Sequence, residues 1–103
     1  MEIFSFKLQI REGSENEYVR RHQAVYPELL KAFGENGIKT YNIFMDGTTL
    51  YAYMEAKDIE SALKAIQFHP ANIQWQKFMS DILIADENGI TMTKLTNVFS
   101  FNQ

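Results

Sequence analysis

Hydrophobic and polar residues alternate in three stretches of the chain, as they do in half-buried β-strands. In the first stretch, residues 3–10, apolar side chains fill every second position from Phe4 to Ile10. The same period of two returns over residues 38–45 and 49–56. Asp46-Gly47 lies between these two stretches and is a strong signal for the turn of a β-hairpin. The pattern predicts these three strands, and a last strand over residues 94–101.

The segments between these strands have helical signals. Ser14 and Glu17 have the spacing of a capping box, which predicts a first helix from Glu15 toward Gly34 or Gly37. Asp58 is a plausible cap for a second helical region.

Two prolines interrupt the helical segments, because proline removes a helical hydrogen bond. Pro27 predicts a kink just after His22. Pro70 divides the second region into a short helix over residues 59–68 and another over residues 71–85.

The predicted order is βαββαβ, the pattern of the ferredoxin-like fold. We therefore expect an α+β protein with an antiparallel sheet and its helices on one face. The other face would carry mixed polar and aromatic side chains, among them Asn42, Phe44, Tyr51 and Tyr53. Two such faces packed together would form a homodimer, whereas a monomer would leave this face in water.

Composition limits the classes of protein that need to be considered. The 103 residues suit one domain, residues 1–103, and 46% hydrophobic with 22% charged residues is typical of a globular protein. No apolar run approaches the roughly 20 residues of a membrane span, and the first residues do not resemble a signal peptide. We expect the cytoplasm as the compartment and no membrane partner.

Charge and cysteine content argue against several kinds of site. A formal charge of −3 disfavours nucleic acid as a partner. Without cysteine there is no disulfide, no thiol nucleophile and no cysteine-based metal site. His22 and His69 do not have the spacing of a zinc motif. Aromatic residues make up 14% of this small chain, which favours a large interface or a cavity with aromatic walls.

The first helix contains the most informative side chain. Its core-facing stripe runs through Tyr18, His22, Val25 and Leu29, so a histidine occupies a position where an aliphatic residue is expected. A buried imidazole without a partner costs about 1–3 kcal/mol. Either His22 is a core residue bonded to a backbone carbonyl or to Tyr18, or it is a proton donor or acceptor facing a cavity.

Other candidates come from the sheet. Tyr41 shares a face with Ile43 and could line the same cavity, as could Tyr51 or Tyr53. The alternative for Tyr41 is a position at the edge of the core with its hydroxyl at the surface.

Trp75 lies on an apolar stripe of its helix and is expected in the core. Gln76 lies about 100° around that helix, either in solvent or where its amide meets a ligand hydroxyl. Arg20 and Arg21 point in different directions, which favours a solvated face over an anion site. His69 is expected to be a loop residue that ends the short helix.

Several segments together form a recognisable pattern: Glu17-Tyr18-Val19-Arg20-Arg21-His22, Tyr26-Pro27-Glu28-Leu29, Tyr41-Asn42-Ile43-Phe44, Asp46, Trp75-Gln76-Lys77-Phe78-Met79-Ser80-Asp81 and Val98-Phe99. This pattern resembles the L-rhamnose mutarotase family, whose signature is E-Y-x-R-R-H-x-x-x-x-P-E-L. The resemblance covers nearly the whole chain.

The resemblance implies a dimeric α+β barrel that interconverts the α and β anomers of a 6-deoxy-hexose. His22 would be the proton donor, and Tyr18, Tyr41 and Trp75 would bind the sugar. Gln76 replaces the second tryptophan of a family pair and would offer the sugar an amide, so the substrate is L-rhamnose or a related sugar such as L-fucose. The reaction needs no metal, redox centre or covalent intermediate, and we expect no cofactor.

Two other functions are compatible with the same architecture, because one fold carries many functions. One is a cofactor-free monooxygenase acting on an aromatic substrate. The other is a non-catalytic dimeric module that binds a ligand.

Overall fold

A computed structural model describes residues 1–89 and 91–103. In chain order these residues form β1 (Glu2–Gln9), α1 (Glu15–His22), α2 (Pro27–Glu35), β2 (Ile38–Asp46), β3 (Thr49–Ala56), α3 (Ile59–Gln67), α4 (Pro70–Met79) and β4 (Met92–Leu95).

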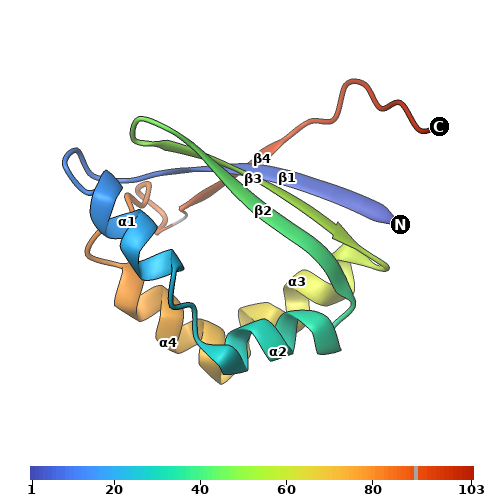
Figure 1. Ribbon diagram of the computed structural model, residues 1–103, viewed down its shortest axis with the longest axis horizontal. Helices are drawn as coiled ribbons and strands as arrows, with labels where there is room; N and C mark the ends of the chain where they lie inside the picture. The colour runs from blue at the N-terminus through green and yellow to red at the C-terminus, as the bar shows by residue number, and fades with distance from the viewer. Residues whose placement is uncertain (90) are drawn as a thin grey trace.

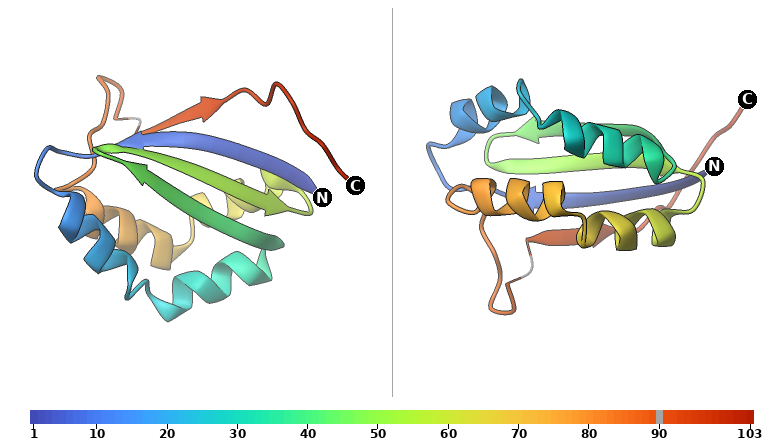
Figure 2. Two further views of the ribbon diagram at one scale, coloured as in Figure 1. Left: turned by 45° about the horizontal axis from the view of Figure 1, so that its top comes forward. Right: turned by 90° about the horizontal axis from the view of Figure 1, so that it is seen from below.

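The strands form one antiparallel sheet in the order β2-β3-β1-β4. The helices cover one face of this sheet (Figure 1). The ferredoxin-like α+β prediction is therefore confirmed, with each helical segment made of two helices. Figure 2 shows that the segment after β4 extends away from the sheet and that both termini lie at the same end of the molecule.

The hairpin between β2 and β3 follows the prediction. Its strands pair in register from Tyr41 opposite Met54 to Asp46 opposite Thr49. Gly47 has a φ of 60°, which a residue without a Cβ adopts at little cost. Alternation along β2 and β3 therefore assigns successive side chains to opposite faces of the sheet.

Each of the two prolines is the first residue of a helix. For Pro27 the prediction was a kink within one continuous helix. The residue before a proline is pushed out of the helical region, and Tyr26 and His69 have ψ values of 127° and 131°. Pro27 and Pro70 then occupy the first turns of α2 and α4, where a missing N–H costs nothing. The first helix therefore ends at His22, and a separate helix, α2, starts at Pro27.

The two predicted caps have different outcomes. Asp58 caps α3 as expected, since its carboxylate accepts a hydrogen bond from the Ser61 backbone N–H at 3.1 Å. The capping box at the start of α1 is wrong, because the Ser14 side chain makes no capping hydrogen bond. The Glu17 carboxylate is instead bonded to two arginines of its own helix.

The last two predicted elements are shorter than expected. The predicted helix over residues 71–85 ends at Met79, because the next residues pair with the end of β1 through a bridge between Ile10 and Leu83. The predicted strand over residues 94–101 is observed at Met92–Leu95. Beyond it the Asn97 side chain accepts a hydrogen bond from the Phe99 N–H at 2.9 Å, and this local turn interrupts the extended chain.

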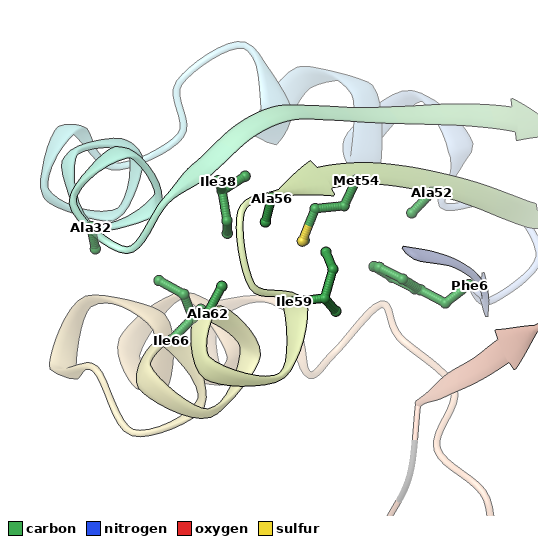
Figure 3. Close-up of a cluster of buried hydrophobic side chains, with 9 residues drawn as sticks. All are labelled: Phe6, Ala32, Ile38, Ala52, Met54, Ala56, Ile59, Ala62 and Ile66. Atoms are coloured by element: carbon green, nitrogen blue, oxygen red, sulfur yellow. The ribbon is translucent and has the colours of Figure 1, made fainter. Parts of the chain in front are cut away.

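The core beneath the helices consists of two clusters. The first, drawn in Figure 3, packs α2 and α3 against the sheet and contains Phe6, Ala32, Ile38, Ala52, Met54, Ala56, Ile59, Ala62 and Ile66. The second surrounds α4 and contains Ile10, Tyr18, Leu29, Leu50, Ala71, Trp75, Met79, Ile82 and Leu83. Leu8, Phe33 and Ile43 are half-buried and pack against both clusters.

Candidate active site

A cavity of about 730 Å³ lies between the helices and the covered face of the sheet. Most of its lining is aliphatic or aromatic and comes from both core clusters. Its polar side chains belong to Tyr18, His22, Tyr41, Gln67, Asn72, Gln76 and Thr91. An apolar cavity with a few convergent polar groups is the usual form of a small-molecule site.

Helix α1 contributes two stacked rings to this cavity. Tyr18 and His22 are four residues apart, so they lie on the same side of the helix. Their ring centroids are 4.1 Å apart and their planes are inclined by 23°. Tyr18 is buried and His22 is half-buried.

One hydrogen bond fixes the tautomer of the His22 ring. Nδ1 lies 2.9 Å from the backbone carbonyl oxygen of Tyr18. Because a carbonyl only accepts, Nδ1 carries the hydrogen, and Nε2 of the neutral ring is left as an acceptor. The bond to a backbone carbonyl is thus as expected for one of the two readings of His22. The ring also lines the cavity, and its part as a proton donor or acceptor stays a prediction.

Burial lowers the pKa of His22 below its ordinary value, and the bond to the Tyr18 carbonyl opposes this shift. The ring is therefore neutral at neutral pH. A protonated His22 is in turn a stronger acid than an ordinary imidazolium.

Trp75 is both a core residue and part of the cavity wall. Its side chain is buried, as predicted from the stripe on α4, and it lines the cavity. The His22 and Trp75 ring centroids are 5.3 Å apart with planes inclined by 87°, an edge-to-face contact. Tyr26 contacts the same indole in the same way at 5.0 Å.

Tyr41 reaches the cavity from β2. Its ring packs against Phe33 and Phe6, with centroid distances of 5.4 and 6.3 Å. Burial raises the pKa of Tyr41 to about 12, and burial together with Tyr41 raises the pKa of Tyr18. Both phenols therefore stay protonated and can donate hydrogen bonds.

Tyr51 and Tyr53 do not share this cavity, and that part of the prediction is wrong. In the register of the hairpin Tyr51 pairs with Phe44 and Tyr53 with Asn42. These positions alternate with Tyr41, so they lie on the face of the sheet that the helices leave uncovered.

Gln76 lines the cavity from α4, and its side chain is exposed. Its amide nitrogen donates to the Asn72 side-chain oxygen at 3.4 Å. Asn72 and Gln67, which also line the cavity, were not predicted from the sequence. Asn72 precedes Gln76 by one helical turn, and this spacing is the signal that could have identified it.

The two arginines before His22 have different environments. Arg20 is exposed, as predicted, with 69% of its side chain accessible. For Arg21 the prediction of a solvated side chain is wrong, because only 11% is accessible. Its guanidinium bonds to the Asp81 carboxylate at 2.9 and 3.0 Å and lies 4.3 Å from the centre of the Phe78 ring.

His69 lies outside the cavity and has a structural role. Its Nδ1 accepts a hydrogen bond from the Ala71 backbone N–H at 3.1 Å. His69 therefore caps the start of α4, in addition to following the end of α3 as predicted.

Within the described residues, no three His, Asp or Glu side chains are grouped as a metal site would require. In the same part of the chain, no helix combines the length and apolar character needed to cross a membrane.

Fold and cavity together define a ferredoxin-like α+β protein with a cavity between sheet and helices. A structure from Nitrosomonas europaea assigned to the antibiotic biosynthesis monooxygenases shares this fold, with a TM-score of 0.64, 10% identity, and 90% of this chain and 84% of that chain covered. At this identity the likeness shows the fold alone.

The comparisons at the level of sequence define the family. The model of the L-rhamnose mutarotase family matches residues 4–101. The L-rhamnose mutarotase of Lachnoclostridium phytofermentans is 36% identical over 92% of this chain and 93% of its own length. That of Clostridium beijerinckii is 34% identical over 93% of this chain and 94% of its own. The chain belongs to the L-rhamnose mutarotase family.

A crystal structure of the same family agrees closely. The L-rhamnose mutarotase FA22100 from Formosa agariphila is 26% identical, with a TM-score of 0.85, and the match covers 99% of this chain and 100% of that one. The predicted resemblance is thus confirmed along nearly the whole chain.

Proposed function

We propose that this protein is a mutarotase that interconverts the α and β anomers of a 6-deoxy-hexose, with L-rhamnose as the first candidate. Family membership supports the reaction. The observation that carries the assignment within the cavity is His22, whose Nδ1 is anchored and whose Nε2 is left for a ligand.

Mutarotation opens the hemiacetal ring and closes it again on the other face of C1. In ring opening the bond between C1 and the ring oxygen breaks, the ring oxygen gains a proton and the anomeric hydroxyl loses one. We assign His22 as the donor to the ring oxygen, through Nε2. Nε2 accepts in the neutral ring, so it must first take up a proton from solvent. Burial makes the resulting imidazolium a stronger acid than an ordinary one, and it also keeps the protonated fraction small at neutral pH.

A water molecule is the best candidate for the group that takes the anomeric proton. Tyr18 and Tyr41 have raised pKa values, so both phenols stay protonated and cannot take up this proton. Among the described residues that line the cavity there is no Asp or Glu. Within one copy of the chain this leaves solvent as the base, and ring closure reverses both transfers.

Side chains from α1, β2 and α4 would bind the sugar. Tyr18 and Tyr41 are protonated phenols that can donate to sugar hydroxyls. Trp75 offers an aromatic surface to the apolar side of the pyranose. The Gln76 amide is bonded to that of Asn72. This bond uses one donor and one acceptor, so the pair still has an N–H donor and a carbonyl acceptor for two neighbouring sugar hydroxyl groups.

We propose that the protein acts as a homodimer through the uncovered face of its sheet. On this face Phe44 lies beside Tyr51, and their side chains are 63% and 41% exposed. The chain end adds Val98, Phe99 and Phe101, which are all strongly exposed. A second copy offers a matching apolar surface and would remove both regions from water. We further infer that residues 1–103 act as one domain and that the compartment is the cytoplasm.

The test is NMR saturation transfer between the anomers of L-rhamnose, with L-fucose in a parallel series. The wild-type protein should accelerate exchange, and His22→Ala should lower kcat by about 10²–10⁴-fold, the usual contribution of a general acid. Circular dichroism should show that the variant is folded. His69→Ala removes the other histidine, outside the cavity, and should retain wild-type turnover; equal rates for His22→Ala and His69→Ala would reject His22 as the donor.

A further inference from the structure

Helix α1, which carries His22, has little of its own to hold it in place. It has eight residues, of which Tyr18 alone is fully buried. A helix of this length is not stable by itself, and its packing must come from tertiary contacts. His22 is its last residue, so the ring is at the end that frays most easily.

Arg21 supplies the second attachment of this helix. Its Nη1 and Nη2 donate to the two carboxylate oxygens of Asp81, just beyond α4, at 2.9 and 3.0 Å. Nη1 also donates to the backbone carbonyl of Phe78 at 2.9 Å, and the guanidinium lies over the Phe78 ring. The Nε of Arg21 donates to Glu17 on α1 at 2.7 Å. One side chain therefore joins α1 to the C-terminal end of α4.

Trp75, the aromatic neighbour of His22, lies on the helix that Arg21 holds. We propose that Arg21 is a positioning residue that keeps His22 in register with Trp75 by fixing α1 to the end of α4. The catalytic part of this proposal rests on the proposed function, in which His22 delivers the proton.

The geometry explains why an arginine is needed. A planar guanidinium can bond a carboxylate with two parallel N–H groups while its face lies on an aromatic ring, and a lysine ammonium can do neither. A displacement of about 1 Å at a reacting group can lower a rate by about 100-fold. Loosening this contact should therefore affect the catalytic step more than the binding of sugar.

Arg20 is a matched control next in the sequence. It is also bonded to Glu17, through its Nε at 2.8 Å, but its side chain is largely exposed. The bonds of Arg20 remain within α1, whereas those of Arg21 reach the far helix. Comparing variants of Arg20 and Arg21 therefore separates the effect of bonds within α1 from the effect of the link between α1 and α4.

The experiment compares Arg21→Lys, Arg21→Gln and Arg20→Gln by anomer exchange and by NMR of the His22 ring. Both Arg21 variants should lose about 10- to 100-fold in kcat with KM changed less than threefold, whereas Arg20→Gln should keep wild-type values. The His22 ring protons should also lose the ring-current shifts caused by Tyr18 and Trp75. Asp81→Asn tests the other half of the contact and should show the same pattern, more weakly.

A purely structural role predicts other results. Arg21→Lys would then lower the melting temperature while leaving kcat and the His22 resonances unchanged, and that outcome overturns the proposal. In a His22→Ala background, Arg21→Lys should cause no further loss of kcat, and an additive loss would equally reject it. If the wild-type protein accelerates no anomer exchange, the proposed function fails, but the His22 resonances still decide whether Arg21 positions the ring.

Discussion

The two faces of the sheet differ in what covers them, although they are built from the same strands. On the covered face Tyr41 and Ile43 line a cavity beneath the helices. Asn42 and Phe44 alternate with them along β2 and are exposed, so they lie on the face that the helices leave uncovered. One face can therefore enclose a small molecule, while the other is free for the proposed contact with a second copy of the chain.

This difference separates the roles of residues that are adjacent in the sequence. A change on the covered face should alter turnover or sugar binding and leave assembly intact. A change on the uncovered face should alter assembly first. The predictions below test this separation, beginning with the largest expected effect.

Phe44→Glu should dissociate the proposed dimer. Burying one phenylalanine contributes about 1.5–3 kcal/mol, and a two-fold interface contains each residue twice. A charge on this face should therefore weaken dimerisation by at least about 100-fold. Sedimentation velocity over a range of concentrations measures the change.

Phe68→Glu is the control for this variant. Phe68 follows α3 and is 69% exposed, similar to Phe44, but lies away from the uncovered face. The Phe68→Glu variant should have the same sedimentation coefficient as the wild type. If Phe44→Glu sediments as the wild type does at every concentration, the uncovered face is not the interface.

Tyr41→Phe should raise KM for the sugar by up to about 10-fold and change the free energy of unfolding little. The variant removes one hydroxyl, and a hydrogen bond from it contributes about 0.5–1.5 kcal/mol. Tyr53→Phe removes the same atom from the uncovered face and should leave KM unchanged. Equal KM values for the two variants would contradict the assignment of Tyr41 to the sugar site.

The fold could be predicted where local signals decide it. The hairpin depends on Asp46-Gly47 and on alternation next to it, and both are visible in the sequence. The end of α4 depends instead on the pairing of Leu83 with Ile10, more than 70 residues earlier. The sequence around Met79 contains no signal for this contact, so the predicted helix extended beyond the observed end of α4.

The same distinction applies to the candidate site. The spacing of Tyr18 and His22 is a property of one helix, so the sequence could indicate that they share a face. The burial of Arg21 depends on Asp81, which is 60 residues away. A helical pattern gives each residue a direction but not the partner it meets, and Arg21 was therefore expected in solvent.

Gln76→Phe should shift the preference between sugars by about threefold, the smallest of these effects, because an exposed hydrogen bond contributes roughly 0.5–1 kcal/mol. The ratio of kcat/KM for L-rhamnose to that for L-fucose measures the shift. Gln74→Phe makes the same change on α4 at an exposed position that does not line the cavity, and its ratio should equal that of the wild type. If both variants leave the ratio unchanged, the Gln76 amide is solvated and does not select the sugar. If only Gln76→Phe changes the ratio, the residues that select the sugar include Gln76 as well as the buried rings of the cavity.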